Sequence, residues 1–523
     1  MSLETFLNNL HFNTDEATSS TWEVDWEDGP LPYKLYQNLP GIPLSSEVTL
    51  TLENLEISTE PSLREIGHFL WYVFGITQFY QSTGPTPEVN VMQSYRRFVP
   101  SGGALYPNEL YIYLKMENVP AGIYHYDVAH HRLVLLREGN FDSYVDRTLG
   151  NSCDTSACFG VIFVSTMFWK NFFKYHNFSY RLQGLDAGVL IGQLFEVAKQ
   201  FQFNSSVHFQ FLDRAINHLL GLSEQEESVY AVIPLSINSE HQKFNHENDD
   251  TNIEVSATQL CEELPIIHHN HYVRSRKIAE YPMLIQMNEA SMLESTQSFQ
   301  TIKSEMNRMH GGQALVLPRI KRMSYDLTAA CQNRFSPEMD FTFKKMSQEQ
   351  LNTLLHEVTD SFAYQNDLDS NYEEIASRVS IYVCLFGVEG IPNGAYHYDS
   401  NAHTLRQVHL GDHRFLLQSG MTLHNVNLFQ VPLCLHVVGD KNHLKTELGY
   451  RGYRIQQMEA GILVQKLLLV ASSLGLGGHP LLGFDVNLCD ELYRLDAEEE
   501  TSLIQIPIGF HRQRPWLRGN LRS

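Results

Sequence analysis

Hydrophobic and polar positions divide the chain into two patterned regions separated by a polar stretch. Between residues 62 and 80 the apolar side chains fall at helical spacing, and residues 109–114 alternate as in a half-buried strand. Residues 236–259 are polar, acidic and nearly free of large apolar side chains, which predicts a linker or an exposed insertion. A second patterned region begins near residue 259 and continues to residue 523. The pattern therefore predicts two halves of similar size.

The two halves repeat each other. The sequence Gly-Ile-Tyr-His-Tyr-Asp at residues 122–127 returns 272 residues later as Gly-Ala-Tyr-His-Tyr-Asp at residues 394–399. A second pair of matches, at residues 180–188 and 453–461, has an offset of 273 residues and ends in an Ala-Gly pair that opens an apolar, helix-like run. Two matches in the same order at nearly one offset indicate a tandem duplication.

Composition argues against several classes of protein. The chain has 523 residues, 43% of them hydrophobic, which is enough for two to four domains. A formal charge of −22 with scattered basic residues argues against a nucleic-acid partner. The first residues lack a basic segment followed by an apolar one, no run approaches the roughly 18 apolar residues of a membrane span, and the seven cysteines are odd in number and mostly far apart. We therefore expect a cytoplasmic protein with reduced thiols and no membrane contact.

Metal and nucleotide motifs are weak or missing. His268, His269 and His271 form a cluster, but no cysteine or acidic residue stands at a recognisable ligand spacing from them. We expect a polar strand edge or loop there, and no metal site. The chain has no P-loop and no Gly-x-Gly-x-x-Gly after a strand, which argues against ATP-driven chemistry and against a Rossmann NAD site.

The strongest candidate site is the loop Arg-Arg-Phe-Val-Pro-Ser-Gly-Gly-Ala-Leu-Tyr-Pro at residues 96–107. Proline fixes the backbone that enters the turn, and Gly102 and Gly103 lack a Cβ, so main-chain groups can approach a ligand closely. A loop built this way can lie flat against a planar ligand. The same residues would also suit a tight turn that leads into a strand.

This loop, with the Gly-Ile-Tyr-His-Tyr-Asp sequence that follows it, resembles the flavin-binding core of the SagB-type, or McbC-type, azoline dehydrogenases, a branch of the FMN-dependent nitroreductase superfamily. Lys174 and Tyr175 stand where that branch carries a Lys-Tyr pair. Nitroreductases are typically two-fold dimers with the flavin at the subunit interface. The resemblance therefore implies an α+β fold of two tandem nitroreductase-like domains, each an antiparallel-rich sheet flanked by helices, that form an intrachain pseudo-dimer.

The resemblance also divides the chain into segments. We expect an N-terminal arm over residues 1–60 and a first domain, with the loop and the Lys-Tyr pair, over residues 61–240. A linker over residues 241–260 would lead to a second domain, on the FMN phosphate side, over residues 261–523.

The parts of the implied FMN site are divided between the halves. The second half lacks Pro-Ser-Gly-Gly and carries Glu447 and Leu448 in place of the Lys-Tyr pair. It does carry an Arg-x-Ser sequence like the family's phosphate grip, a Leu-Gly-Leu-Gly-Gly sequence and an arginine-rich tail, where the first half has none of these. One composite site per chain is implied, and its cofactor-binding residues would be Arg96, Arg97, Pro100, Ser101, Gly102, Gly103, Ala104, Leu105, Arg334, Ser336, Gly475, Leu476, Gly477, Gly478, Arg512 and Arg514.

Three observations count against parts of this assignment. Glu338 stands where the family has a second basic residue, which weakens the expected grip on the phosphate. Arg334 taken alone would also suit a surface helix start. Lys174 lies in an aromatic stretch in which lysines usually extend toward solvent, although a partly desolvated lysine there would have a lowered pKa suited to accepting a proton.

By resemblance, the activity is oxidation of thiazoline or oxazoline rings to thiazoles or oxazoles in a ribosomally made peptide. Lys174 or Tyr175 would remove the ring proton, FMN would take the hydride, and dioxygen would reoxidise the flavin. The partners would be an azoline-containing precursor peptide and the cyclodehydratase that makes it. Two alternatives stay open, a generic NAD(P)H-dependent FMN nitro or enoate reductase and a flavin-free scaffold of a peptide-modifying complex.

Overall fold

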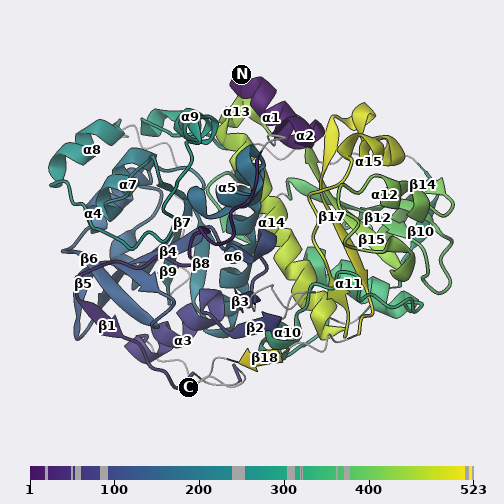
Figure 1. Cartoon of the computed structure of the whole chain (residues 1–523), viewed down its shortest axis with the longest axis horizontal. Helices are drawn as coiled ribbons and strands as arrows, with labels where there is room; N and C mark the ends of the chain where they lie inside the picture. The colour runs from purple at the N-terminus through teal and green to yellow at the C-terminus, as the bar shows by residue number, and fades with distance from the viewer. Residues whose placement is uncertain are drawn as a thin grey trace.

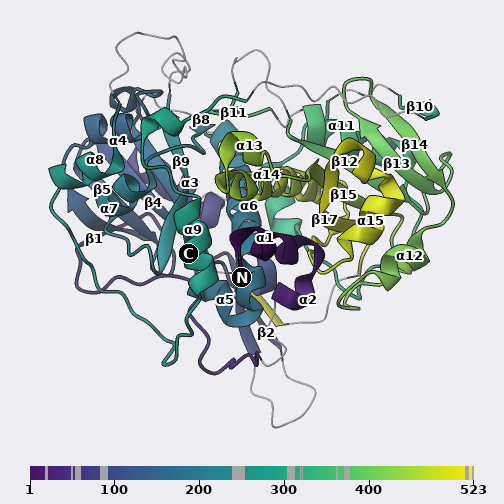
Figure 2. The same cartoon turned by 90° about the horizontal axis from the view of Figure 1, so that it is seen from above.

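Two β-sheets stand on either side of a central pair of long helices in the computed structural model (Figure 1). The central helices are α6 (Ser179–Gln200) and α14 (Arg451–Ser473), and a view turned by 90° shows them between the sheets (Figure 2). The residues that the structure describes are 1–17, 22–48, 51–52, 60–82, 92–237, 254–302, 312–318, 320, 322–360, 363–369, 377–512 and 517–520.

The two sheets share one strand order. In the first sheet the order is β1-β6-β5-β4-β7-β9-β8-β11, and in the second it is β10-β14-β13-β12-β15-β17-β16. The pairs within these sheets are antiparallel except for the parallel pair of β11 and β8. The first sheet consists of β1 (Gly41–Pro43), β4 (Asn108–Met116), β5 (Val119–Asp127), β6 (Arg132–Glu138), β7 (Gly160–Met167), β8 (Asn204–Val207), β9 (Glu227–Ser236) and β11 (Gln365–Asn366). The second consists of β10 (Ala314–Val316), β12 (Val379–Leu385), β13 (Gly394–Asp399), β14 (Thr404–Leu410), β15 (Leu433–Asp440), β16 (Gly477–Gly478) and β17 (Glu500–Gly509).

The sequence repeat falls on equivalent elements of the two sheets. The Tyr-His-Tyr-Asp sequences lie on β5 and β13, each of which pairs with the strand before it and the strand after it. The Ala-Gly pairs lie on α6 and α14, where the helices cross. A Cβ added to Gly188 would overlap the Met458 carbonyl, and one added to Gly461 would overlap the Leu185 carbonyl. The repeated glycines are thus required by close backbone approach.

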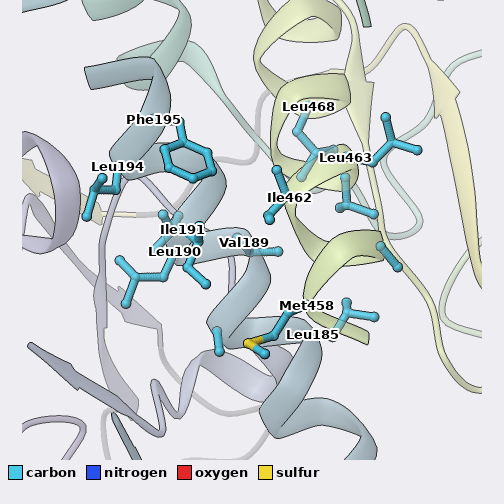
Figure 3. Close-up of a cluster of buried hydrophobic side chains, with 14 of the residues drawn as sticks. Leu185, Val189, Leu190, Ile191, Leu194, Phe195, Met458, Ile462, Leu463 and Leu468 are labelled. Atoms are coloured by element: carbon cyan, nitrogen blue, oxygen red, sulfur yellow. The ribbon is translucent and has the colours of Figure 1, made fainter. Parts of the chain in front are cut away.

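Apolar side chains from both central helices fill the space beside this crossing (Figure 3). Leu185, Val189 and Phe195 of α6 belong to one continuous buried cluster with Met458, Ile462 and other residues of α14. Because most residues of both helices are buried, neither helix shows the polar face of a surface helix. The hydrophobic contact therefore joins the two halves through their longest helices.

Shorter helices surround the sheets. They are α1 (Leu3–Phe12), α2 (Thr14–Ala17), α3 (Leu63–Phe74), α4 (Asp142–Thr148), α5 (Trp169–Tyr175), α7 (Asp213–Leu220), α8 (Ala257–Glu263), α9 (Pro282–Ala290), α10 (Leu327–Asn333), α11 (Gln348–Asp360), α12 (Arg414–Ser419), α13 (Lys445–Leu448) and α15 (Val486–Tyr493). The helical pattern at 62–80 matches α3, which starts with a capping box at Ser62 and ends before Gly75. Residues 78–80, at the end of that predicted stretch, belong instead to strand β2 (Gln78–Ser82).

Several segments depart from the predicted division of the chain. The first residues are helical as α1 and α2, which the sequence pattern did not predict. The predicted linker lies mostly outside the described residues, and its end forms the start of α8, which packs beside α7. A three-stranded sheet joins β18 (Leu517–Asn520) to β2 (Gln78–Ser82) and β3 (Met92–Arg96), so the end of the chain returns to the first half.

Candidate active site

A buried carboxylate holds the loop that precedes β4. Ser101 Oγ donates to Asp186 Oδ2 at 2.6 Å, and the Gly102 N–H approaches Oδ1 of the same residue at 3.3 Å. Ser101 Oγ also accepts from the Tyr106 N–H at 2.9 Å. Gly103 has a φ of +65°, in the region that side chains disfavour, and it is the most exposed part of the turn. The loop is thus fixed from below by α6, with its glycine facing outward.

Lys174 and Tyr175, in the last turn of α5, lie directly against this glycine. A Cβ added to Gly103 would stand 2.8 Å from Tyr175 Oη and 2.9 Å from Lys174 Nζ. The ammonium of Lys174 also lies 4.8 Å from the centroid of the Tyr175 ring. The structure therefore brings together the loop and the Lys-Tyr pair, two features that are about 70 residues apart in the sequence.

Burial sets the protonation of this cluster. It lowers the pKa of Lys174, and the carboxylate of Glu338 partly opposes this change. It raises the pKa of Tyr175, to which the nearby Asp186 adds. Burial also raises the pKa of Asp186 to about 7, even though Ser101 and Gly102 donate to it. The lysine therefore releases its proton more easily than an exposed lysine, while the phenol keeps its proton at neutral pH.

Arg334, from the second half, reaches across to the same loop. Its Nε donates to the Phe98 carbonyl oxygen at 2.7 Å, and one terminal nitrogen donates to Ser336 Oγ at 3.3 Å. Burial lowers the pKa of Arg334, as does the positive charge of Arg96 nearby. Among the described residues, no carboxylate lies within ion-pair distance of either guanidinium. Two guanidinium groups that no described carboxylate pairs suit a bound phosphate, which such groups hold through paired hydrogen bonds.

The glycine-rich sequence after α14 is joined to the Arg334 segment. Gly477 lies against the Pro337 ring and His511, with no room for a Cβ, and Gly478 belongs to β16 beside β17. The Pro337 carbonyl oxygen is 2.6 Å from His479 Nδ1. Gly475 has a φ of +73° and Leu476 is buried. The structure thus brings the predicted glycines next to the predicted phosphate grip.

The arginine-rich tail is only partly placed. Arg512 is largely exposed, and its Nε donates to Asp340 Oδ1 at 3.2 Å, so this charge already has a partner. Arg514 lies outside the described residues. The tail then forms β18, which pairs with β2, and β2 in turn pairs with β3, the strand that ends at Arg96.

Arg97 has a different role from the predicted one. Its side chain is 3% exposed, and its terminal nitrogens donate to the carbonyl oxygens of Phe74 at 2.9 Å and Pro32 at 2.7 Å. The guanidinium also lies 3.7 Å from the centroid of the Phe74 ring. This arginine therefore anchors the loop to its surroundings and has no free face for a cofactor. Pro100, Ala104 and Leu105 are half-buried along the same loop.

Two residues of this region were not predicted as parts of the site. Asp186 belongs to the repeated Asp-Ala-Gly or Glu-Ala-Gly sequence, and this repeat was the available signal for its importance. Trp26, in the N-terminal arm, lies with its ring centroid 5.4 Å from Lys174 Nζ. No sequence signal could have placed it there, because the arm is distant from Lys174 along the chain and its position depends on tertiary packing.

Residues 340–510 match the model of the nitroreductase family. The whole chain has the fold of a nitroreductase-like protein of Anabaena variabilis, with a TM-score of 0.74 and 21% identity over 98% of this chain and 99% of the other. Trifolitoxin-processing protein TfxB of Rhizobium leguminosarum bv. trifolii is 28% identical over 157 residues, which are 29% of this chain and 41% of that protein. A nitroreductase-like protein of Methanocaldococcus jannaschii is 28% identical over 134 residues, 25% of this chain and 64% of that protein.

The chain thus spans less than two thirds of the length of each of these two curated relatives. Across the described ranges, no helix is long and apolar enough to cross a membrane, and no group of three His, Cys, Asp or Glu side chains is placed to hold a metal ion. The fold is a nitroreductase-like α+β fold with sheets and flanking helices. The second half of the chain therefore contains a nitroreductase-family domain.

Proposed function

We propose that this protein is an FMN-dependent oxidoreductase that converts thiazoline or oxazoline rings in a ribosomally made peptide to thiazoles or oxazoles. The observation that carries the proposal is the meeting of parts from both halves at one loop. Arg334 donates to the Phe98 carbonyl oxygen at one side of the loop, and Gly103 contacts Lys174 and Tyr175 at the other. A cation pair suited to a phosphate and a proton-transfer pair thus share one site.

The described residues fit FMN in two respects. Arg334, Arg96 and Ser336 would hold its phosphate, since the two guanidinium groups have no carboxylate partner among the described residues. The loop at Gly102–Gly103 and the backbone at Gly475 would lie against the rest of the cofactor, since a Cβ added to Gly475 would meet no other described group within 4 Å. Gly477 and Gly478 pack against protein and would support that segment from behind. When bound, FMN would accept a hydride from the azoline ring, with dioxygen as the final acceptor.

The chain's own residues would move the ring proton. Lys174 is the better base, because burial lowers its pKa and so increases the fraction of neutral amine. Tyr175 keeps its phenolic proton and would donate a hydrogen bond to the ring heteroatom or to its flanking amide. Asp186 would hold the loop through Ser101 and would not itself contact the substrate.

We also infer that the halves are duplicated domains that form an intrachain pseudo-dimer with one composite site. The common strand order of the two sheets, the repeated motifs and the close crossing of α6 and α14 support this inference. The predicted limits of the domains, 61–240 and 261–523, belong to this proposal.

The relative from Rhizobium favours a peptide substrate, since its name describes a protein that processes trifolitoxin. An azoline-containing precursor peptide and the cyclodehydratase that makes it would then be the partners. A second candidate, an NAD(P)H-dependent FMN nitro or enoate reductase, is favoured by the nitroreductase family match alone. Such a reductase would have no need for the Lys-Tyr pair.

Purified protein reconstituted with FMN and given a synthetic thiazoline peptide tests the proposal. We expect a yellow protein that converts the peptide to a product lighter by two hydrogens, in air and without a nicotinamide. Rapid flavin reduction by NAD(P)H with no change in the peptide would support the reductase instead. Failure to retain any flavin would support a flavin-free scaffold.

A further inference from the structure

Residues 22–36 of the N-terminal arm run beside the candidate active site and are anchored on α5. Trp22 Nε1 donates to the Phe173 carbonyl oxygen at 3.1 Å, and the Trp22 ring packs edge-on against Phe172 with centroids 5.6 Å apart. A Cβ added to Gly29 would lie 3.0 Å from the Phe173 ring. The arm therefore packs closely along the helix that ends in Lys174 and Tyr175.

The same arm continues to the loop and into the core. The Pro32 carbonyl oxygen accepts a hydrogen bond from Arg97 at 2.7 Å. This bond joins the arm to the loop at residues 96–107. Lys34 is buried and pairs with Glu227 at 2.6 Å. On the outer side, the carboxylate of Asp28 accepts from the backbone N–H groups of residues 276 and 277 at 2.8 and 2.9 Å. The arm is thus fixed on both sides of Trp26.

Trp26 is nevertheless exposed. Its relative exposure is 53%, whereas Trp22, Trp71 and Trp169, the other tryptophans that the structure describes, are half-buried. Its ring packs edge-on against Phe173, with centroids 5.6 Å apart, and its face lies toward Lys174 Nζ at 5.4 Å. An indole that is half exposed on a firmly anchored segment offers a large apolar surface at little cost in side-chain entropy.

We propose that Trp26 is the contact between this site and its peptide, and that its indole packs against the planar five-membered ring or the peptide unit beside it. The inference rests on the proposed function, because a ring whose proton Lys174 removes must lie within hydrogen-bond reach of Nζ. A ring that approaches Nζ from the side of the exposed indole comes within van der Waals reach of Trp26, whose ring centroid is 5.4 Å from that nitrogen. The ligand class is a peptide with an azoline or azole ring, bound beside the N-terminal arm.

Binding can be tested apart from turnover with a synthetic peptide that carries the oxidised thiazole ring, since this ring is not oxidised further. Isothermal titration calorimetry would compare wild type, Trp26→Ala and Trp26→Phe. We expect Trp26→Ala to weaken binding about tenfold and Trp26→Phe to keep most of the affinity, because an aromatic face is what the site uses. Tyr272→Ala is the matched control, since Tyr272 is also about half exposed on the segment beside the arm and should be neutral.

Kinetics on the thiazoline peptide provide the second readout. Trp26→Ala should raise KM by a similar factor and change kcat by much less, with rescue by Trp26→Phe. Equal binding and equal KM in wild type and Trp26→Ala would overturn the inference and leave the proposed function intact. Wild-type protein that neither binds the thiazole peptide nor oxidises the thiazoline peptide would overturn both.

Discussion

The two halves meet along α6 and α14, and the cationic side chains at the two ends of this contact differ in their partners. At the candidate active site, Arg96 and Arg334 have no carboxylate partner among the described residues. At the other end, β8 takes the place in its sheet that β16 takes in the second sheet, and it lines a cavity of about 210 Å³. There, Glu196 accepts from Lys466 Nζ at 2.7 Å and from Lys199 Nζ at 2.8 Å. At the second end both lysines are paired with one carboxylate, that of Glu196, whereas the described residues of the first end give its two guanidinium groups no carboxylate.

The repeated acidic residue before each Ala-Gly pair shows the same contrast. Asp186 accepts hydrogen bonds from Ser101 and Gly102, and within the described ranges it has no cationic partner. Its counterpart Glu459 accepts from Arg378 Nε at 2.8 Å and from the Tyr364 hydroxyl. The two carboxylates keep equivalent places in the repeat but differ in partners. The comparison teaches that two halves with the same strand order can differ at equivalent positions in the charged partners of a single side chain.

The largest expected effect is on turnover. The double variant Lys174→Ala with Tyr175→Ala should lower azoline oxidation by at least the ~10²–10⁴-fold typical of general acid–base groups while the protein stays yellow. The mirrored variant Glu447→Ala with Leu448→Ala should cost stability at most, because only Leu448 of that pair is buried. Steady-state rates of azoline oxidation measure turnover in the two double variants, and absorbance spectra show whether each still binds flavin. Near-normal turnover in the first variant would contradict the assignment of the proton-transfer pair.

Asp186→Asn should change how stability depends on pH. The raised pKa of Asp186, about 7, means that the folded state binds this proton more tightly than the unfolded state. Its contribution to stability is therefore present below pH ~4 and is lost as pH rises toward ~7, by a few kcal/mol at most. Urea unfolding at several pH values should show a flatter profile for the variant. Parallel profiles for wild type and Asp186→Asn would contradict the raised pKa.

Arg334→Ala should weaken FMN binding. Charge-assisted contacts of this kind contribute roughly 1.5–3 kcal/mol, so the affinity should fall about tenfold or more. Lys199→Ala removes a cation at the other end of the contact and should leave FMN affinity unchanged, because that lysine is paired with Glu196. Fluorescence titration of flavin-free protein measures both. If the two variants bound FMN equally well, the phosphate site would have to lie elsewhere.

The smallest expected effect concerns the crossing of α6 and α14. Gly188→Ala places a methyl group against the Met458 carbonyl, and overpacking of this kind costs typically about 1–3 kcal/mol. Gly483→Ala is a suitable control, because its Cβ would find Thr422 at an ordinary 3.4 Å. The free energy of unfolding from chemical denaturation should separate the two. Equal stability would mean that the helices can move apart without cost.

Local patterns in the sequence predicted the helix now seen as α3, the strand at residues 109–114 and the repeat that falls on β5, β13, α6 and α14. They did so because periodicity and repeated motifs are local signals. Arg97 shows the limit of this approach. Its position in the loop sequence suggested a cofactor-binding residue. In the structure its guanidinium instead donates hydrogen bonds to the carbonyl oxygens of Phe74 and Pro32.

Long-range packing decided the rest. Three contacts join segments that are far apart in the chain. They are the hydrogen bond between Asp186 and the loop, the approach of Trp26 to Lys174, and the pairing of β18 with β2. Spacing along the sequence has no information on such contacts. The charge balance at the two ends of the contact between halves was likewise hidden, since Glu196, Lys199 and Lys466 come from two helices of different halves.

The number of flavins per chain tests the central claim most directly. Protein saturated with FMN, separated from free cofactor and then denatured should release one equivalent of FMN per chain, because among the described residues only one end of the contact leaves two guanidinium groups without a carboxylate. Two equivalents would show that the second end also binds the cofactor despite its internal ion pairs. Release of none would contradict the composite site.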